Sequence, residues 1–214
     1  MTDGWDESAA AWIDGLGDNG DWSRRHVLDA PMLARIAGRG FSSAIDIGCG
    51  EGRFCRMMRE RGLRTCGVDP TLALVAEARR RDPEGDYRIG RAEALDAETA
   101  AFDLAVSYLS LIDIPGLKAA IGEVHRVLRP GGTFLIANLQ SFNTAGPPTG
   151  WTKEADGSRR FYIDHYLDER AQWVAWQGVR IVNWHRPPRR LYAGPARCRL
   201  RTPVFRGTRT IRRR

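Results

Sequence analysis

Apolar and polar positions along the first 140 residues follow a regular rhythm of short apolar runs and longer helical patterns. Short apolar runs predict strands, whereas apolar side chains that recur every three or four residues predict helices. The runs that predict strands are 42–47, 64–68, 86–89, 102–107 and 133–139. The stretches that predict helices are 21–37, 52–61, 72–81 and 117–128. Strands that alternate with helices in this way are typical of an open parallel sheet with helices on both faces.

The rhythm ends after residue 140. Residues 141–160 are rich in Gly and Pro and predict a loop, whereas 161–169 and 172–184 predict short antiparallel strands with many aromatic side chains. Such a segment beside a ligand site is where substrate pockets are commonly built. The expected layout is one domain over 1–185, with N-terminal helices in 1–40, a substrate-side insertion in 140–185 and a tail over 186–214.

A glycine-rich turn follows the first predicted strand, in the run Ala-Ile-Asp-Ile-Gly-Cys-Gly-Glu-Gly around Asp46. Gly48, Gly50 and Gly52 allow a sharp turn and let a ligand approach the main chain closely. The helix start behind them offers free N–H groups, and the Asp46 carboxylate suits an ammonium group or ribose hydroxyls. The dinucleotide fingerprint is G-x-G-x-x-G, but Arg53 stands where its third glycine would be. The turn alone therefore indicates a ligand near the backbone without naming it.

Further landmarks follow the later strands. Asp69 and Pro70 close the second strand, where a carboxylate can bind both ribose hydroxyls; the alternative role of Asp69 is to cap the next helix. The other stretches are Gly-Arg-Ala-Glu-Ala at 90–94, Phe-Asp-Leu-Ala-Val-Ser at 102–107 and Glu-Val-His-Arg-Val-Leu-Arg-Pro-Gly-Gly at 123–132. Together with the glycine turn, they resemble in order and spacing the motifs of the class I S-adenosylmethionine (SAM) dependent methyltransferases, of the small-molecule type 11 group.

The resemblance implies SAM as the methyl donor, S-adenosylhomocysteine (SAH) as the product, and a Rossmann-like α/β fold whose seven-stranded sheet ends in an antiparallel strand. The cofactor-binding positions that it implies are Asp46, Gly48, Cys49, Gly50, Gly52, Asp69, Pro70, Ala92, Glu93, Ser107, Tyr108, Leu109 and Arg25. The glycine turn would hold the methionine part, Asp69 the ribose, and residues 92–93 the adenine. Residues 107–109 would leave their strand towards the sulfonium.

Three arginines bear on how closely the chain follows the family. Arg91 stands where related enzymes often carry an acid against the adenine, which weakens that contact but leaves backbone N–H groups available. An N-terminal helix in the family often contacts the SAM carboxylate, and Arg24 or Arg25 is placed to do so. The ordinary alternative for either arginine is a solvated charge on a helix surface.

The expected reaction is an in-line displacement at the sulfonium methyl carbon, for which the protein chiefly aligns the reacting groups. A base is needed only if the acceptor must lose a proton. His165 and His185, in the aromatic segment, are the candidates, and packing is the alternative role of each. His125, on a predicted helix, is expected to be a surface or packing residue. The sequence shows no carboxylate cluster for a metal, and it does not specify the small-molecule acceptor or its nucleophilic atom (O, N or C).

The net charge of +7 comes from one end of the chain. From Ala171 onward there are 12 Arg and no acidic residue, whereas the first 170 residues hold 21 Lys and Arg against 26 Asp and Glu. A basic protein usually suggests nucleic acid as a partner, but here the main part is mildly acidic, so nucleic acid is not the expected partner. No apolar run reaches the roughly 20 residues of a membrane span. The four cysteines form no metal or disulfide pattern, so a cytoplasmic location is expected.

The tail over 186–214 lacks the pattern of a packed helix or strand. A reading of permitted codons in the next frame from Pro188 yields an amphipathic helix, a Gly-Phe turn and a strand, the elements with which relatives continue. Our hypothesis is a frameshift near codon 188; the alternative is a basic arm that binds RNA or DNA. Beside the small-molecule methyltransferase, two alternatives stay open: a truncated SAM-binding protein of poor activity, and an RNA methyltransferase that uses the tail.

Overall fold

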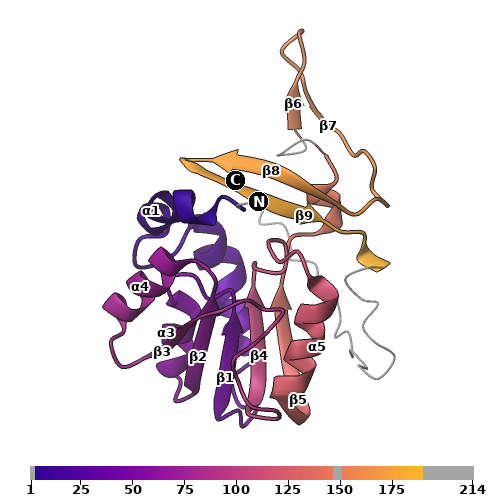
Figure 1. Cartoon of the computed structure of the whole chain (residues 1–214). Helices are drawn as coiled ribbons and strands as arrows, with labels where there is room; N and C mark the ends of the chain where they lie inside the picture. The colour runs from indigo at the N-terminus through magenta and orange to yellow at the C-terminus, as the bar shows by residue number, and fades with distance from the viewer. Residues whose placement is uncertain (1–2, 147–150, 190–214) are drawn as a thin grey trace.

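The computed structural model describes residues 3–146 and 151–189 (Figure 1). Its helices are α1 (Trp5–Leu16), the π-helical segment η1 (Arg24–Leu28), α2 (Asp29–Ala34), α3 (Arg53–Arg59), α4 (Leu72–Arg81), α5 (Leu117–Val127) and α6 (Ser141–Thr144). Its strands are β1 (Ser43–Ile47), β2 (Arg64–Asp69), β3 (Asp86–Ile89), β4 (Phe102–Tyr108), β5 (Leu128–Ala137), β6 (Trp151–Lys153), β7 (Arg159–Phe161), β8 (Arg170–Trp176) and β9 (Val179–His185).

The central sheet has the order β3-β2-β1-β4-β5, and all its neighbouring strands run parallel. The expected open parallel sheet is therefore confirmed, and the described residues supply five of the seven strands that the resemblance implies. The chain order reverses between β1 and β4, which lie side by side. Ligands in open sheets bind beyond the carboxyl ends of the strands at such a switch point.

Helices cover both faces of this sheet because its inner strands are apolar on both sides. All five residues of β1 are buried, as expected for a central parallel strand. Ala44 belongs to a cluster with Phe54 and Met58 of α3, whereas Ile45 belongs to the cluster that α5 forms, including Val124. Successive residues of the strand thus pack against opposite layers.

A hairpin and the N-terminal helix lie together across one end of the sheet (Figure 1). The hairpin is β8–β9, and we call it, together with α1, the roof. The Ser8 hydroxyl of α1 donates to the Arg180 carbonyl (3.1 Å) and accepts from its N–H (2.9 Å). Trp5 and Trp12 pack on the buried Ile181 and its neighbours in the hairpin. Two segments at opposite ends of the described chain therefore form one cover.

Several expected elements match the structure closely, but others do not. The segment expected to be a loop over 141–160 contains α6, β6 and the start of β7. α4 and β3 have the predicted bounds, 72–81 and 86–89. The helix expected over 21–37 is shorter and begins as a π-helix. The strand expected over 161–169 is wrong: after Phe161 the chain forms a loop, because the Arg170 guanidinium, not a neighbouring strand, takes up main-chain carbonyls there. The pairs β6–β7 and β8–β9 supply the antiparallel insertion.

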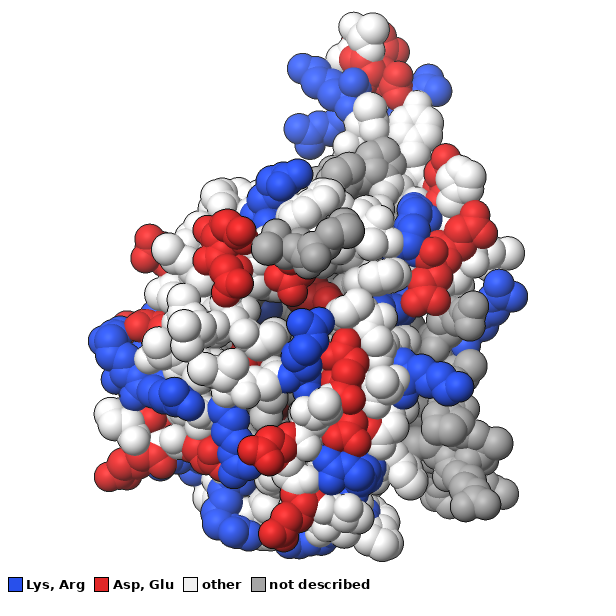
Figure 2. Space-filling view, viewed as in Figure 1, with Lys and Arg blue, Asp and Glu red and all other residues white. Residues whose placement is uncertain are grey.

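The Arg-rich tail lies almost wholly outside the described residues. Arg186 and Pro187 are buried, so the packed chain continues past the predicted boundary at residue 185. Nine of the 33 Lys and Arg lie in 190–214, so the described residues carry 24 against 26 Asp and Glu. Acidic and basic side chains are intermingled on the face that Figure 2 shows. Within residues 3–146 and 151–189, no helix is long and apolar enough to cross a membrane.

Candidate cofactor and substrate site

A cavity of about 500 Å³ is lined by residues at the carboxyl ends of the strands and by residues of the roof. Its lining divides into two parts by origin. The glycine-turn half comprises residues that follow β1, β2 and β3, with the N-terminal residues beside them. The hairpin half comprises residues that follow β4 and β5, residues of β8 and β9, and the N-terminal Asp3 that pairs with β9. A cavity of this size and position fits a small-molecule site.

The glycine turn is folded against β2 by its own backbone. The N–H groups of Gly48 and Cys49 both donate to the Val68 carbonyl, at 2.8 and 3.1 Å. Gly48 has φ +73°, and a Cβ there would lie 2.4 Å from the Ser110 Cβ. A side chain at position 48 is therefore excluded by both conformation and space. Gly48, Cys49 and Gly50 line the cavity, as the sequence predicts for the methionine site.

Asp46 is buried beneath this turn, and its carboxyl pKa is raised. Its Oδ2 accepts a weak bond from the Cys55 thiol (3.6 Å), and its Oδ1 has no hydrogen-bond partner among the described residues. Burial raises the pKa of Asp46 to about 7, and the charges of Asp69 and Glu51 add to the effect. A buried acceptor without a donor is costly, so this oxygen suits a cationic or hydrogen-bonding ligand.

Asp69 holds two backbone segments with its two oxygens. Oδ2 accepts from the Gly50 N–H and Oδ1 from the Thr71 N–H, both at 2.9 Å. Burial raises the pKa of Asp69, while these two bonds act in the opposite direction. The predicted ribose-binding residue thus also ties the glycine turn to the start of α4. Its neighbour Pro70 lines the cavity as well.

The end of β4 is anchored by a hydrogen bond from its last residue, and the residue that follows it has a strained backbone conformation. Tyr108 lines the cavity and donates to Asp29 (2.7 Å), which also pairs with Arg53. Leu109 has φ +61°, which is uncommon for a residue with a side chain and typical of functional sites. Ser107 is fully buried and bonds to the Ser110 hydroxyl (2.6 Å), so it braces the loop from behind and is not a lining residue.

The structure distinguishes between the two candidate arginines. Arg24 lines the cavity, where its guanidinium carbon lies 4.9 Å from the centre of the Trp12 ring and 5.7 Å from that of Tyr108. It also pairs with Asp21. Arg25 is exposed and is not a lining residue. The contact that the sequence assigns to Arg25 is therefore geometrically available to Arg24.

Of the remaining predicted cofactor positions, two line the cavity and one does not. Ala92 and Glu93 line the cavity. Glu93 also accepts from the Gly116 N–H (3.0 Å), which fixes it beside the start of α5. Gly52 is not a lining residue; it has φ +78°, and a Cβ there would lie 2.6 Å from the Tyr87 ring, so its glycine serves the turn itself.

Neither predicted catalytic histidine lines the cavity. His185 is fully buried, with Nδ1 2.8 Å from the Thr144 hydroxyl and Nε2 3.0 Å from the Tyr166 carbonyl. Burial lowers its pKa. His165 is two-thirds exposed and lies beside Asp168 (3.1 Å). Proton transfer by either side chain would first require it to reach the cavity.

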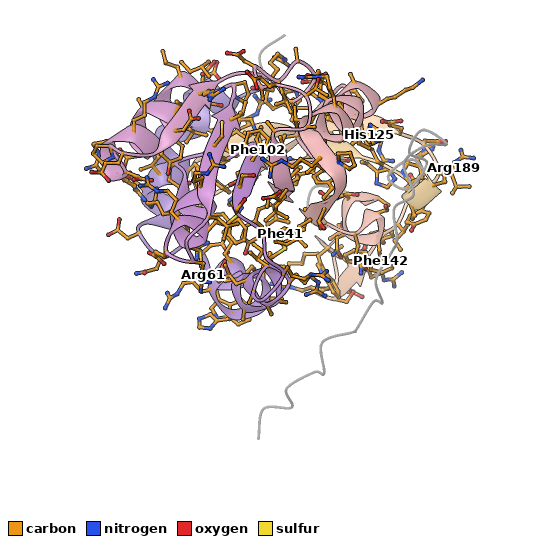
Figure 3. The ribbon with its side chains drawn as sticks, turned by 90° about the horizontal axis from the view of Figure 1, so that it is seen from below. Phe41, Arg61, Phe102, His125, Phe142 and Arg189 are labelled. Atoms are coloured by element: carbon orange, nitrogen blue, oxygen red, sulfur yellow. The ribbon has the colours of Figure 1, made fainter. Side chains whose placement is uncertain are left out.

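His125 lies exposed on α5 (Figure 3), where the sequence predicts a surface or packing residue. Figure 3 views the sheet from the end opposite the roof and labels Phe41 and Phe102, which precede β1 and begin β4. The histidine therefore lies on an outer helix, apart from the residues that line the cavity.

Sequence reasoning missed most of the hairpin half and several residues of the roof. Asp113 accepts a bond from the Asn183 side chain (2.5 Å) across the cavity wall, and Trp176 lines the opposite side. Glu51 is 2% exposed, and one of its oxygens lacks a hydrogen-bond partner among the described residues, although the sequence predicts no role for it beyond the turn. Glu51 was visible in the glycine motif. Nothing in the sequence near Asn183 or Trp176 indicates that they meet the ends of β4.

The lining fits the chemistry of SAM, which carries a sulfonium, an ammonium and one carboxylate. Asp46 offers an unpartnered oxygen to a cation, and Asp69 lies where a ribose would meet β2. Arg24 offers a positive charge to the carboxylate. In the part of the chain that the structure describes, no group of three or more His, Cys, Asp or Glu is arranged to hold a metal ion.

Comparisons with known proteins agree with this fit. The sequence model of a family described as a methyltransferase domain matches residues 45–136. A solved S-adenosylmethionine dependent methyltransferase from Mesorhizobium loti is 31% identical, with 74% of each chain covered and a TM-score of 0.61. Malonyl-[acyl-carrier protein] O-methyltransferase of Salmonella typhimurium is 37% identical over 73% of this chain and 61% of its own length. The ubiquinone/menaquinone biosynthesis C-methyltransferase UbiE of Rubrivivax gelatinosus is 28% identical over 77% of this chain and 70% of its own length.

The chain spans less than two thirds of the length of the carrier-protein methyltransferases: 61% of the Salmonella protein and 56% of the Serratia marcescens one. The family match over residues 45–136 covers the glycine turn and nearly all of the central sheet, from β1 to β5. Family match, fold and lining lead to one conclusion: the chain belongs to the class I SAM-dependent methyltransferases, and SAM is its cofactor.

Proposed function

We propose that the protein transfers a methyl group from SAM to a small-molecule acceptor bound in the hairpin half of the cavity. The observation that carries the proposal is the continuity of the cavity, which joins the glycine turn and Asp69 to Asp113 and the hairpin under one roof. Bound SAM supplies an activated methyl group, so alignment of the acceptor is the main task of the protein.

The lining residues support a separate role for each region of the chain. We propose that Asp46 and the glycine turn bind the ammonium end of the methionine, Arg24 its carboxylate and Asp69 the ribose. The strained step at Leu109 would then present the end of β4 to the reacting centre. The roof covers one side of the cavity, and exclusion of water there would strengthen the charge interactions within it.

Titration calorimetry with SAM, SAH and NAD tests the cofactor assignment. We expect SAM and SAH to bind with one-to-one stoichiometry and NAD not to bind. Tight NAD binding without SAM or SAH binding would overturn the proposal. Incubation with methyl-labelled SAM and pooled small molecules then identifies the acceptor class through the labelled product.

A second candidate acceptor comes from the relatives. Three of them, 33% to 37% identical, are named as malonyl-[acyl-carrier protein] O-methyltransferases. An acyl group on a carrier protein is therefore the second acceptor class for the labelling experiment. Transfer of label to a malonyl-carrier protein but to no free small molecule would favour it.

A further inference from the structure

The hairpin half of the cavity is acidic. Its charged lining residues among those described are Asp113 and Asp3. The arginines that line the cavity, Arg24, Arg53 and Arg91, all belong to the glycine-turn half. Each already has an acidic neighbour: Asp21, Asp29 and Glu93, respectively. The cationic groups that would be needed to recognise a carboxylate acceptor therefore lie at the other end of the cavity.

Asp113 is held firmly at the floor of this half. It closes a turn in which its N–H donates to the Ser110 carbonyl (2.9 Å). Strand β9 of the hairpin stabilises this turn, because its Trp184 N–H donates to the Ile112 carbonyl (2.6 Å). Within the described residues, Oδ1 of Asp113 takes one hydrogen bond, from Asn183, and Oδ2 takes none. One carboxylate oxygen is therefore available to a ligand.

The surrounding charges make Asp113 a poor neighbour for a second anion. Burial raises the pKa of Asp113 well above its ordinary value; Asp69 and Asp3 add to the effect, while Asn183 and Arg24 oppose it. Arg186 packs beneath the same turn, but its guanidinium is occupied by Glu169 and three main-chain carbonyls: those of Leu111, Ile114 and Pro115. A cation beside Asp113 would offset the negative charge of the neighbouring carboxylates, whereas a carboxylate ligand would increase the repulsion between them.

The walls around Asp113 are apolar and offer hydrogen-bond acceptors. Ile112, Val174 and Ile181 line the space and are at least nine-tenths buried. Asn138 lines it too, and its buried side-chain oxygen has no hydrogen-bond partner among the described residues. A ligand that matches the hairpin half therefore combines an apolar body, which packs on these walls, with N–H donors for the free oxygen atoms.

We infer that the methyl acceptor is a primary or secondary amine on an apolar body, bound and deprotonated by Asp113; the inference rests on the proposed function. The ammonium form donates its proton to Asp113 Oδ2, which exposes the nitrogen lone pair. As the N–C bond forms, the S–C bond of the donor breaks and its electron pair stays on sulfur. The product leaves as a methylated ammonium, and Asp113 returns its proton to solvent.

Matched ligands with one apolar body test this inference by direct binding. Benzylamine and benzoate are titrated into the full chain with saturating SAH, and the dissociation constants are compared. We expect benzylamine to bind at least about tenfold more tightly, a difference of about 1.4 kcal/mol. Asp113→Asn should abolish the preference, whereas Asp156→Asn, at an exposed position outside the cavity, should keep it.

Equal or tighter binding of benzoate, no binding of either ligand, or a preference that survives in Asp113→Asn would each overturn the inference. The pH dependence is a second readout that a merely structural role would not give. Benzylamine should bind more tightly as the pH rises and Asp113 ionises, up to the pH at which benzylamine itself loses its proton. Failure of SAH to bind would instead contradict the proposed function, and the same ligand pair without SAH would still decide the preference.

Discussion

Replacing Asp69 with Ala should destabilise the protein before any cofactor is added. The two oxygens of Asp69 accept the buried N–H group of Thr71 and the half-buried N–H group of Gly50, both at 2.9 Å. A buried donor left without a partner costs about 1–3 kcal/mol, so the two together would cost at most about 2–6 kcal/mol, and less because the Gly50 N–H faces the cavity. Loss of the buried carboxylate offsets part of this, because burial raises its pKa and so disfavours the charged form. We expect a net loss near the lower limit, about 2 kcal/mol.

Urea unfolding of the free protein measures this loss, and calorimetry with SAH measures the separate effect on binding. We expect Asp69→Ala to weaken SAH binding at least about 100-fold, or 2.7 kcal/mol, because the turn is loosened and the ribose loses its partner. Asp86→Ala is the matched control: its carboxylate lies on β3 in an exposed pair with Arg88 and should contribute no more than about 1 kcal/mol. An unfolding free energy of Asp69→Ala equal to that of the wild type would refute the structural role, and unchanged SAH affinity would refute the placement of the site.

Three further substitutions separate packing from ligand binding. Gly48→Ala should abolish SAH binding and lower the unfolding free energy by at least about 1 kcal/mol, because its Cβ would meet Ser110; a fully stable variant that still binds SAH would contradict this. Asp46→Asn should raise stability at pH 8 relative to the wild type, because a raised carboxyl pKa means that ionisation costs stability as the pH rises from about 4 through 7. The wild-type affinity for SAH should rise over the same interval, and a flat pH profile would exclude Asp46 as the partner of the ammonium. His185→Ala should lower the unfolding free energy by about 3 kcal/mol through lost packing and two lost hydrogen bonds, whereas His165→Ala should leave it within about 0.5 kcal/mol; the reverse order in urea unfolding would refute these roles.

The sheet and the glycine-turn half of the cavity could be predicted because they depend on local sequence. Short apolar runs locate the strands, and the parallel pairing brings Asp69 beside the turn that follows Asp46. The resemblance adds the order of the landmarks. The choice between Arg24 and Arg25 could not be predicted, because the segment that holds them is π-helical in the structure and the α-helical spacing of side chains does not apply to it.

The hairpin half could not be predicted because long-range contacts determine it. Asn183 meets Asp113 across 70 positions of sequence, and neither residue lies in a motif. The strand expected over 161–169 failed for a related reason: the apolar side chains of Ile163 and Leu167 are exposed in a loop that Arg170 organises. Apolar pattern alone does not distinguish a strand from a loop whose carbonyls a guanidinium takes up.

The roof has a consequence for how the protein acquires its activity. Because Ser8 and Arg180 are 172 positions apart, the contact that holds the roof together has a very high sequence separation, and we expect it to form late in folding. A chain whose central sheet is already folded would still lack a complete cavity until residues 170–185 have been synthesised and docked on α1. Tight cofactor binding would then report complete folding of the described chain, and circular dichroism alone would overestimate the fraction of competent protein.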